Sequence, residues 1–206
     1  MKKLALIFLL LFTMAGMTSP PEASPDVKAG LERALAEFRD VSLKRDVEGI
    51  MSFFHPGLYT LMPKEQVKKA MTRAFVEGLA PQIKSMQFQF PGPVRAYSKG
   101  HSALIDTVTE LAMRRPGDVT PEIDEIMVGL IKKRLGEEVE IRVDEKNNVI
   151  LVRKKSWLLA LNEGSGGWEG SGGREGRGGW KFINKDRVGF FVENNLLSDE
   201  LKELLP

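Results

Sequence analysis

The sequence predicts an α+β domain in which N-terminal helices pack on an antiparallel sheet and one helix is inserted between strands. Two observations predict this class. Apolar residues up to about residue 77 recur every three or four positions, as on one face of a helix, whereas later apolar residues mostly alternate with polar ones, as in strands. The expected strands also follow one another with a single helical segment among them, an order that disfavours an alternating parallel sheet.

Two helices are expected before residue 55. The first begins after Ser24, a residue type that favours the N-cap position, and has Pro25 in its first turn. The apolar residues on its expected buried face are Val27, Leu31, Ala34, Leu35 and Phe38. Asp46 is expected to cap a short helix over residues 47–54, which ends before His55-Pro56 because a residue that precedes proline avoids helical geometry.

A third helix is expected from about residue 64 to residue 77, followed by Gly78 at the position where helices commonly end. Its expected buried residues are Val67, Ala70, Met71, Ala74 and Phe75. The helix inserted among the strands is expected over residues 120–135, with acidic residues early, basic residues late and Gly136 at its end. Its expected apolar stripe consists of Ile123, Ile126, Met127, Leu130 and Ile131.

The remaining segments are expected to form one antiparallel sheet. Met86, Phe88 and Phe90 alternate with polar residues, which predicts a strand with one solvent-exposed face. Further strands are expected at residues 101–113, 139–143, 149–161 and 180–183. Ser198 is expected to cap a closing helix that ends near Leu205.

Residues 164–179 are expected to be a glycine-rich insertion in a hairpin turn. The segment repeats six residues, as GSGGWE, GSGGRE and GRGGWK, and only the third copy continues into a strand. Lengthening a loop about threefold costs roughly 1 kcal/mol of closure entropy, so a stable domain tolerates it. Two arginines offset by glutamates argue against a nucleic-acid site, and the open alternative is a mobile flap that places Trp168 over a pocket.

The first 23 residues are expected to be a signal peptide and a short spacer. Lys2 and Lys3 precede an apolar run over residues 4–12, and small residues follow, with Ala15 or Ala23 near the expected cleavage point. The apolar run is shorter than the ~20 residues that span a bilayer. We therefore expect an exported protein, periplasmic or secreted, with no membrane anchor after cleavage.

The composition excludes several kinds of chemistry. The chain has no cysteine, hence no disulfide, cysteine nucleophile or cysteine-linked lipid anchor, and only two histidines are available to a transition-metal site. Without Lys2 and Lys3 the 30 basic residues fall to 28 and equal the 28 acidic ones, so no net charge favours nucleic acid. We expect one domain over residues 24–206, with no catalytic constellation, no metal site and no cofactor.

Four residues are candidates for a ligand site. His55 and Tyr59 follow an apolar helix and are interpreted as a polar pair at a pocket rim; the alternative is that the His55 ring closes a helix terminus. Asp106 is either a buried carboxyl that can act as an acid or base, or a solvent-exposed strand residue. Trp157 is either part of the core or a binding platform.

Residues 45–75, RDVEGIMSFFHPGLYTLMPKEQVKKAMTRAF, and residues 178–183, GGWKFI, carry a resemblance to a known superfamily. The chain resembles exported bacterial members of the nuclear-transport-factor-two-like superfamily, which includes ketosteroid-isomerase-like and SnoaL-like domains. The similarity lies in a long first helix, a short helix that ends at an aromatic-His-Pro sequence, a third helix that begins near KEQ, and a late glycine followed by Trp-Lys-Phe.

This resemblance implies a cystatin-like cone, in which a curved antiparallel sheet wraps the helices and leaves an apolar pocket at its open end. We expect non-catalytic binding of a small apolar molecule or a peptide there, with His55, Tyr59, Asp106 and Trp157 as candidate contacts. The alternatives are a homodimer that pairs through its sheet, as many relatives of this superfamily do, and an isomerase, dehydratase or hydrolase that uses Asp106 or His55.

Overall fold

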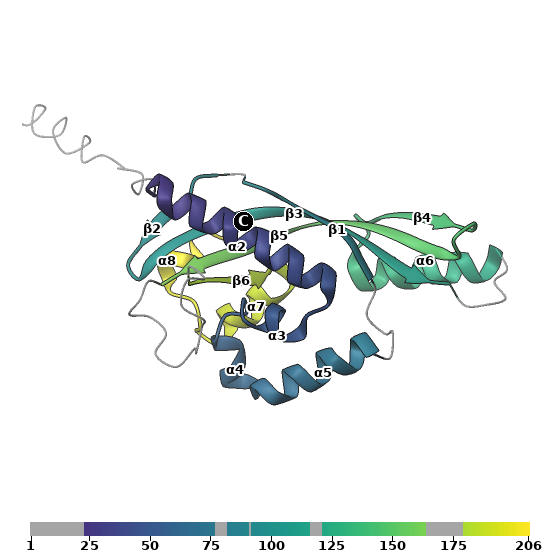
Figure 1. Cartoon of the computed structure of the whole chain (residues 1–206), viewed down its shortest axis with the longest axis horizontal. Helices are drawn as coiled ribbons and strands as arrows, with labels where there is room; N and C mark the ends of the chain where they lie inside the picture. Colours follow the sequence, from purple (N-terminus) through teal and green to yellow (C-terminus); the bar gives the residue numbers. More distant parts are fainter. Residues whose placement is uncertain (1–22, 77–81, 91, 116–120, 164–178) are drawn as a thin grey trace, which may run out of the picture.

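The computed structural model describes residues 23–76, 82–90, 92–115, 121–163 and 179–206 (Figure 1). The expected signal peptide, the glycine-rich insertion and the helix end at Gly78 lie outside the described residues. The described helices are α2 (Pro25–Lys44), α3 (Val47–Met51), α4 (Gly57–Leu61), α5 (Lys64–Val76), α6 (Pro121–Leu135), α7 (Lys185–Glu193) and α8 (Asp199–Lys202). The described strands are β1 (Gln82–Gln89), β2 (Arg95–Tyr97), β3 (Gly100–Arg114), β4 (Glu140–Asp144), β5 (Val149–Asn162) and β6 (Trp180–Asn184).

The α+β class is confirmed, because the six described strands form one curved, unclosed antiparallel sheet with helices packed against it (Figure 1). β3 and β5 form its centre and pair without a break from His101–Asn162 to Arg114–Val149. β1 and β2 both pair with β3 on one side of this centre, and β4 and β6 both pair with β5 on the other. The N-terminal helices precede the sheet, and α6 is inserted between β3 and β4, as predicted.

Local sequence explains the first two helices. α2 begins at Pro25 as predicted, although Ser24 occupies the N-cap position without a side-chain hydrogen bond. Asp46 caps α3, because its Oδ1 accepts a hydrogen bond from the Gly49 amide at 3.0 Å. α3 is shorter than predicted, and the residues after it turn so that Phe54 forms a β-bridge with Phe182 of β6.

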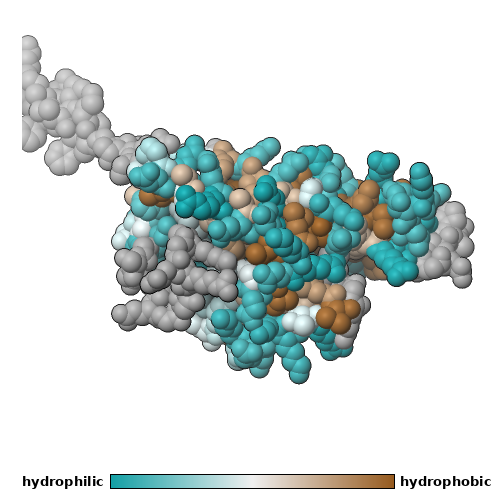
Figure 2. All heavy atoms as spheres, in the orientation of Figure 1, coloured by the Kyte–Doolittle hydropathy of each residue, from teal (hydrophilic) through white to brown (hydrophobic). Residues whose placement is uncertain are grey.

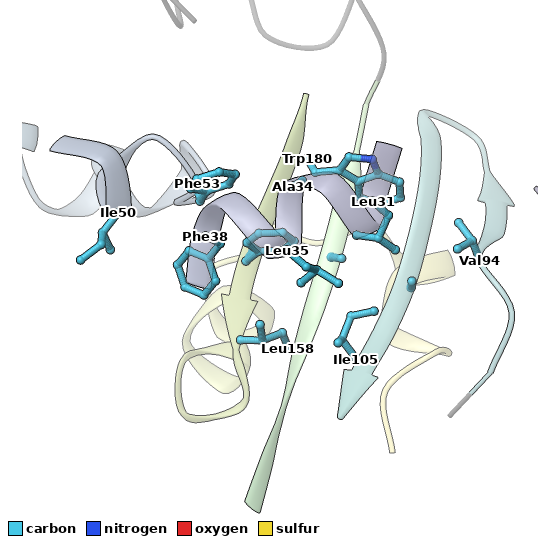
Figure 3. Packing of buried hydrophobic residues seen from close by; sticks show 13 residues of the cluster. Leu31, Ala34, Leu35, Phe38, Ile50, Phe53, Val94, Ile105, Leu158 and Trp180 are labelled. Atoms are coloured by element: carbon cyan, nitrogen blue, oxygen red, sulfur yellow. The ribbon is translucent and has the colours of Figure 1, made fainter. Parts of the chain in front are cut away.

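One face of the sheet packs on α2 and α3 and forms the inner cluster (Figure 3). Leu31 and Leu35 point from α2 towards the strands, beside Trp180 and Ile105 respectively. The fully buried members are Leu31, Ala34, Leu35, Phe38, Ile50, Phe53, Val94, Ala103, Ile105, Leu158, Ala160, Trp180 and Phe182. The predicted faces of α2 and β1 are confirmed, because Met86, Phe88 and Phe90 also pack against this cluster.

The opposite face of the same strands packs on α7 and α8 and forms the outer cluster. Its fully buried members are Tyr97, Leu159, Leu161, Ile183, Val188, Phe191, Leu197 and Leu201. The predicted cap of the last helix is confirmed, since the Ser198 side chain accepts a hydrogen bond from the Leu201 amide, but α8 is shorter than predicted. The short elements α4, β2 and α7 were not predicted from the sequence.

We call residues 108–115 and 121–155 the wing, and the other described residues the body. The wing holds α6, β4 and the paired ends of β3 and β5, and it extends from one end of the molecule (Figure 1). Its core, the wing cluster, consists of Ile131, Val139, Ile150 and Val152, with half-buried apolar residues around them.

The predicted stripe of α6 is only partly buried. Ile131 is buried and Met127 packs on the wing cluster, but Ile126 and Leu130 are 62% and 61% exposed. The five apolar residues cover a wider arc of the helix than one sheet face can bury, so part of the predicted stripe is exposed. The burial predicted for α5, which packs on α3 (Figure 1), was wrong at one position, because Val67 is buried as predicted but Ala70 is exposed.

Candidate functional site

A cavity of about 230 Å³ lies at the end of the sheet where β2 pairs with β3. Its lining residues are Gly92, Pro93, Arg95, Ser102, Ala103, Leu104, Leu159 and Leu204. Ser102 and Leu104 alternate along β3 and share one face with Leu159, which pairs with Leu104. This is the face that carries the outer cluster, so the cavity lies on the side of the sheet opposite α2.

Ser102 is the distinctive polar residue of this cavity. Its side chain is 1% exposed, and its Oγ has no hydrogen-bond partner among the described residues. A buried hydroxyl without a partner destabilises a fold by about 1–3 kcal/mol relative to a satisfied one. Such a group is retained at a cost to stability, which marks it as a candidate contact for a bound molecule.

Arg95 places a positive charge at the entrance. It pairs directly with Ser102 across the β2–β3 ladder, so the two side chains lie on the same face. Arg95 is exposed, and it forms no ion pair within the part of the chain that the structure describes. The cavity therefore runs from an exposed guanidinium to a buried hydroxyl.

The β2–β3 hairpin is held firmly against the rest of the sheet. Gly100 has φ +154°, and a Cβ atom there would collide with the Asn162 carbonyl oxygen, so the turn requires glycine. The Tyr97 hydroxyl donates a hydrogen bond to Glu163 at 3.0 Å, and the Ser98 amide donates one to Glu200 at 3.1 Å. Burial and the Glu163 carboxylate raise the pKa of Tyr97, which therefore remains a neutral donor.

The described lining of the cavity places no catalytic base beside Ser102. The lining contains no histidine or carboxylate side chain among the described residues. His101 is adjacent in sequence, but it projects from the other face of β3 because side chains alternate along a strand. A serine hydroxyl with no neighbouring base is a weak nucleophile, so the arrangement suits binding better than catalysis.

His55 lies outside this cavity. It is 4% exposed, its Nδ1 accepts a hydrogen bond from the Gly57 amide at 3.1 Å, and its ring lies edge-on to Phe191 at 5.2 Å. Burial, and then the charges of Lys181 and Lys99, lower the pKa of His55 from 6.5 to about 4. The neutral ring thus closes the start of α4, whereas the alternative to a pocket rim placed it at the end of the preceding helix.

Tyr59 does not contact His55 through any described hydrogen bond. Its hydroxyl donates to the Met51 carbonyl at 3.0 Å and ties α4 to the end of α3. Burial, and then the charge of Glu48, raise the pKa of Tyr59 to about 12. The phenol is therefore a structural donor that remains protonated at neutral pH.

Asp106 and Trp157 form a cross-strand pair on the outer face of the sheet. Asp106 is exposed, whereas Trp157 is half-buried and packs against the outer cluster. The structure thus brings these two predicted residues together and leaves His55 and Tyr59 at the α3–α4 corner. None of the four lines the cavity, so their predicted role in ligand binding remains a prediction.

Sequence reasoning missed Ser102 and Arg95. A serine between His101 and Ala103 in "HSALI" is an ordinary strand feature, and Arg95 follows a Pro-Gly-Pro segment that gave no strand signal. The weak available signal was that Ser102 shares its strand parity with Leu104. The lack of a hydrogen-bond partner for the Ser102 hydroxyl becomes visible only in the fold, where Leu159 and Leu204 lie beside it.

Two other classes of site, a metal centre and a membrane span, have no counterpart among the described residues. No group of three or more histidine, cysteine, aspartate or glutamate side chains there is arranged to hold a metal ion. No described helix combines the length and apolar character needed to cross a membrane.

No protein-family model, curated protein or solved structure matches this chain. The resemblance to nuclear-transport-factor-two-like domains therefore remains a prediction from the residues.

Proposed function

We propose that this protein binds a small molecule in the cavity beside Ser102 without transforming it. The observation that carries this proposal is that Ser102 lines a cavity and has a buried hydroxyl with no hydrogen-bond partner among the described residues. A ligand that supplies a hydrogen-bonding group would remove the unfavourable free energy of that unpaired hydroxyl. Part of the ligand's binding free energy would then come from giving the unpaired Ser102 hydroxyl a hydrogen-bond partner.

The lining indicates the chemistry of the ligand. Leu104, Leu159 and Leu204 offer an apolar wall, Ser102 offers one hydrogen bond, and Arg95 offers a positive charge at the entrance. The volume of about 230 Å³ is below the roughly 300 Å³ at which drug-sized sites begin. We expect a small, mainly apolar molecule with one polar or anionic group, and not a peptide.

We further propose that the curved sheet and the N-terminal helices form a cystatin-like cone whose interior is occupied by side chains. The rings of Phe38, Phe53 and Phe182 lie 5.1 to 5.6 Å apart between α2, α3 and β6. The unpaired hydroxyl instead lies on the outer face of the sheet. The ligand site is therefore placed beside the β2–β3 hairpin and not inside the cone.

Native mass spectrometry of the protein purified from its own host tests this proposal. We expect an additional small mass that disappears on denaturation. Ser102→Leu removes the hydroxyl and fills the cavity, so it should abolish this mass. Ser98→Leu is the matched control, since Ser98 is an exposed serine of the same hairpin and does not line the cavity. A wild-type protein without the additional mass, or a folded Ser102→Leu variant that retains it, would contradict the proposal.

A second measurement separates the hydroxyl from the cavity volume. Ser102→Ala removes a buried hydroxyl without a partner, so the ligand-free protein should gain about 1 kcal/mol of unfolding free energy. The same variant should retain less of the co-purified molecule than the wild type. Equal retention of the molecule by Ser102→Ala would show that the hydroxyl does not bind it. A loss of stability in the ligand-free state would show that another group of the protein forms a hydrogen bond with the hydroxyl.

We also propose that the protein is exported, on the evidence of the basic and apolar pattern over residues 2–12. The intact mass of the protein from separated cell fractions tests this. We expect a chain that begins after Ala15 or Ala23 in the periplasmic or external fraction. A full-length chain confined to the cytoplasm would contradict export without affecting the binding proposal.

A further inference from the structure

The two sides of α6 differ in their surroundings. Met127 and Ile131 pack on the wing cluster. Ile123, Ile126 and Leu130 recur at spacings of three and four residues, so they form a row along one side of the helix. All three are exposed, and within the described chain nothing covers them. We call these three residues the exposed row.

The wing fixes the direction in which the exposed row points. Arg115, which follows β3, makes a two-pronged ion pair with Asp124 of α6, with distances of 3.1 Å from Nε and 2.6 Å from Nη2. Both side chains are largely buried, at 9% and 16% exposure. Together with the wing cluster, this pair anchors α6 on its inner side, so the row faces away from the sheet.

The charges beside the row are distributed asymmetrically along the helix. The exposed Glu125 lies near the N-terminal end, and the exposed Lys133 and Arg134 lie in the last turn. A second α6 in antiparallel orientation brings each Glu125 near the Lys133 of the other copy, and it places Ile126 opposite Leu130. A parallel copy would bring like charges together, and the helix dipoles also favour the antiparallel arrangement.

Gly129 supports close contact on this side of α6. It is exposed, and a Cβ built on it meets no described atom within 4 Å beyond the helix's own backbone, so the packing of the described residues does not require glycine there. Glycine inside a helix destabilises it by roughly 0.5–1 kcal/mol relative to alanine. A neighbouring helix that approaches closely would benefit from the missing side chain.

We infer that two copies of this protein associate through α6, antiparallel about a two-fold axis that crosses the exposed row midway between Ile126 and Leu130. Acidic, apolar and basic residues follow one another along α6, and this order is complementary to itself when a second helix runs in the opposite direction. The partner that fits the exposed row is therefore a second copy of the chain. The 15 residues of α6 span about 22 Å, so the contact is smaller than the roughly 800 Å² per partner of a standard interface. The dimer is therefore weak and depends on concentration, and it does not involve the ligand cavity.

Sedimentation velocity over a concentration series, with the chain as its host produces it, tests this inference. The wild type should shift from monomer to dimer as concentration rises. Leu130→Glu puts two charges into the contact, one per copy, and should weaken association about tenfold or more. Leu61→Glu, which alters an exposed leucine of α4, should leave association unchanged. A wild-type monomer at all concentrations, or a dimer that survives Leu130→Glu, overturns the inference.

A charge exchange tests the antiparallel orientation. Glu125→Lys and Lys133→Glu should each weaken the dimer about threefold, the size expected for two exposed ion pairs. The double variant recreates opposite charges across the two-fold axis and should restore the wild-type affinity. Failure of this restoration, with the single variants weakened, would overturn the antiparallel arrangement.

Discussion

The body and the wing share the same two central strands but bury them differently. In the body, the four consecutive residues of β5 from Leu158 to Leu161 are all buried, because α2 and α3 cover one face and α7 and α8 cover the other. In the wing, Ile150 and Val152 of the same strand are buried, but Arg153 is exposed, because α6 covers one face only. The number of covered faces, and not the strand itself, decides whether burial is continuous or alternating.

This difference also predicts a difference in stability. The body contains two clusters of fully buried side chains, whereas the wing contains one small cluster and one largely buried ion pair. Regions with fewer buried apolar contacts open locally at lower free energy than the whole domain. We therefore expect the wing to open before the body, and its amide hydrogens to exchange faster.

The largest expected effect comes from the body core. Trp180 is 2% exposed and packs beside Leu31 (Figure 3). Trp180→Ala should lower the free energy of unfolding by about 3–5 kcal/mol in urea denaturation.

Ile131→Ala in the wing should mainly accelerate amide exchange of α6. It should change the free energy of unfolding of the body by no more than about 1 kcal/mol. An equal global loss from both variants would show that body and wing unfold as one unit.

A second effect belongs to the body and depends on pH. The pKa of His55 is lowered from 6.5 to about 4 in the folded state, so the unfolded chain binds more protons between these values. Stability is therefore fully present above pH 6.5 and falls as the pH drops towards 4, by up to about 3 kcal/mol. His55→Asn retains an acceptor for the Gly57 amide and should remove this slope in denaturation midpoints.

The control for this slope is the other histidine of the chain. His101→Asn should leave the dependence of stability on pH between 4 and 6.5 intact. If the slope persists in His55→Asn and disappears in His101→Asn, the buried neutral ring is not its source.

A smaller, local effect is expected at the base of the wing. Asp124→Asn leaves the largely buried Arg115 without its carboxylate, and the lost charged hydrogen bonds contribute about 1–3 kcal/mol. We expect faster amide exchange in α6 with little change in the body. Glu137→Gln alters an exposed pair with Lys132 in the same wing and should have almost no effect. Loss of protection in the body would argue that Arg115 and Asp124 support the whole sheet.

The smallest effect should have the opposite sign. Gly129→Ala adds a methyl group where no described residue outside the local helix backbone lies within 4 Å, so it should stabilise α6 by about 0.5–1 kcal/mol. The gain should appear as slower amide exchange in α6 at concentrations where the protein is monomeric. Slower exchange in the body as well would indicate stronger coupling between the two regions than their cores suggest.

The body and the wing share one surface feature, a helix that is covered on one side only. Hydrophobic atoms are visible over the middle of the molecule and at the free end of α5, among hydrophilic ones (Figure 2). α5 is like α6 in having one covered side, since Val67 is buried and Val76 is 80% exposed. Incomplete burial of a helix is thus shared by both regions, but α6 adds the charge order that makes its exposed side self-complementary.

Much of the local structure was predictable because its causes are local. Asp46 and Ser198 cap α3 and α8 through backbone amides three residues away, and Pro25 begins α2. The short elements were harder. α7 begins directly after β6 without a turn signal, and the three residues of β2 are a strand only because β3 lies beside them.

The candidate site was not predictable either, because it depends on residues that are far apart in the sequence. Ser102 has no local feature that distinguishes it from an ordinary strand serine. Its significance depends on Leu159 and Leu204, which lie far away in sequence and complete the cavity around it. The four candidates chosen from the sequence are polar or aromatic residue types that are common in functional sites. For His55, Tyr59 and Trp157, however, hydrogen bonds and packing partners within the fold already explain where the side chains lie.

The α+β class, the caps of α3 and α8, the balance of charge and the absence of cysteine chemistry all follow from the sequence, because periodicity and composition act over a few residues. The packing of distant elements determines which side of α6 is covered, which faces of β5 are buried and which hydroxyl lacks a partner among the described residues. The physical reason is that burial and hydrogen bonding are properties of pairs of residues, and the decisive partners here are distant in the chain.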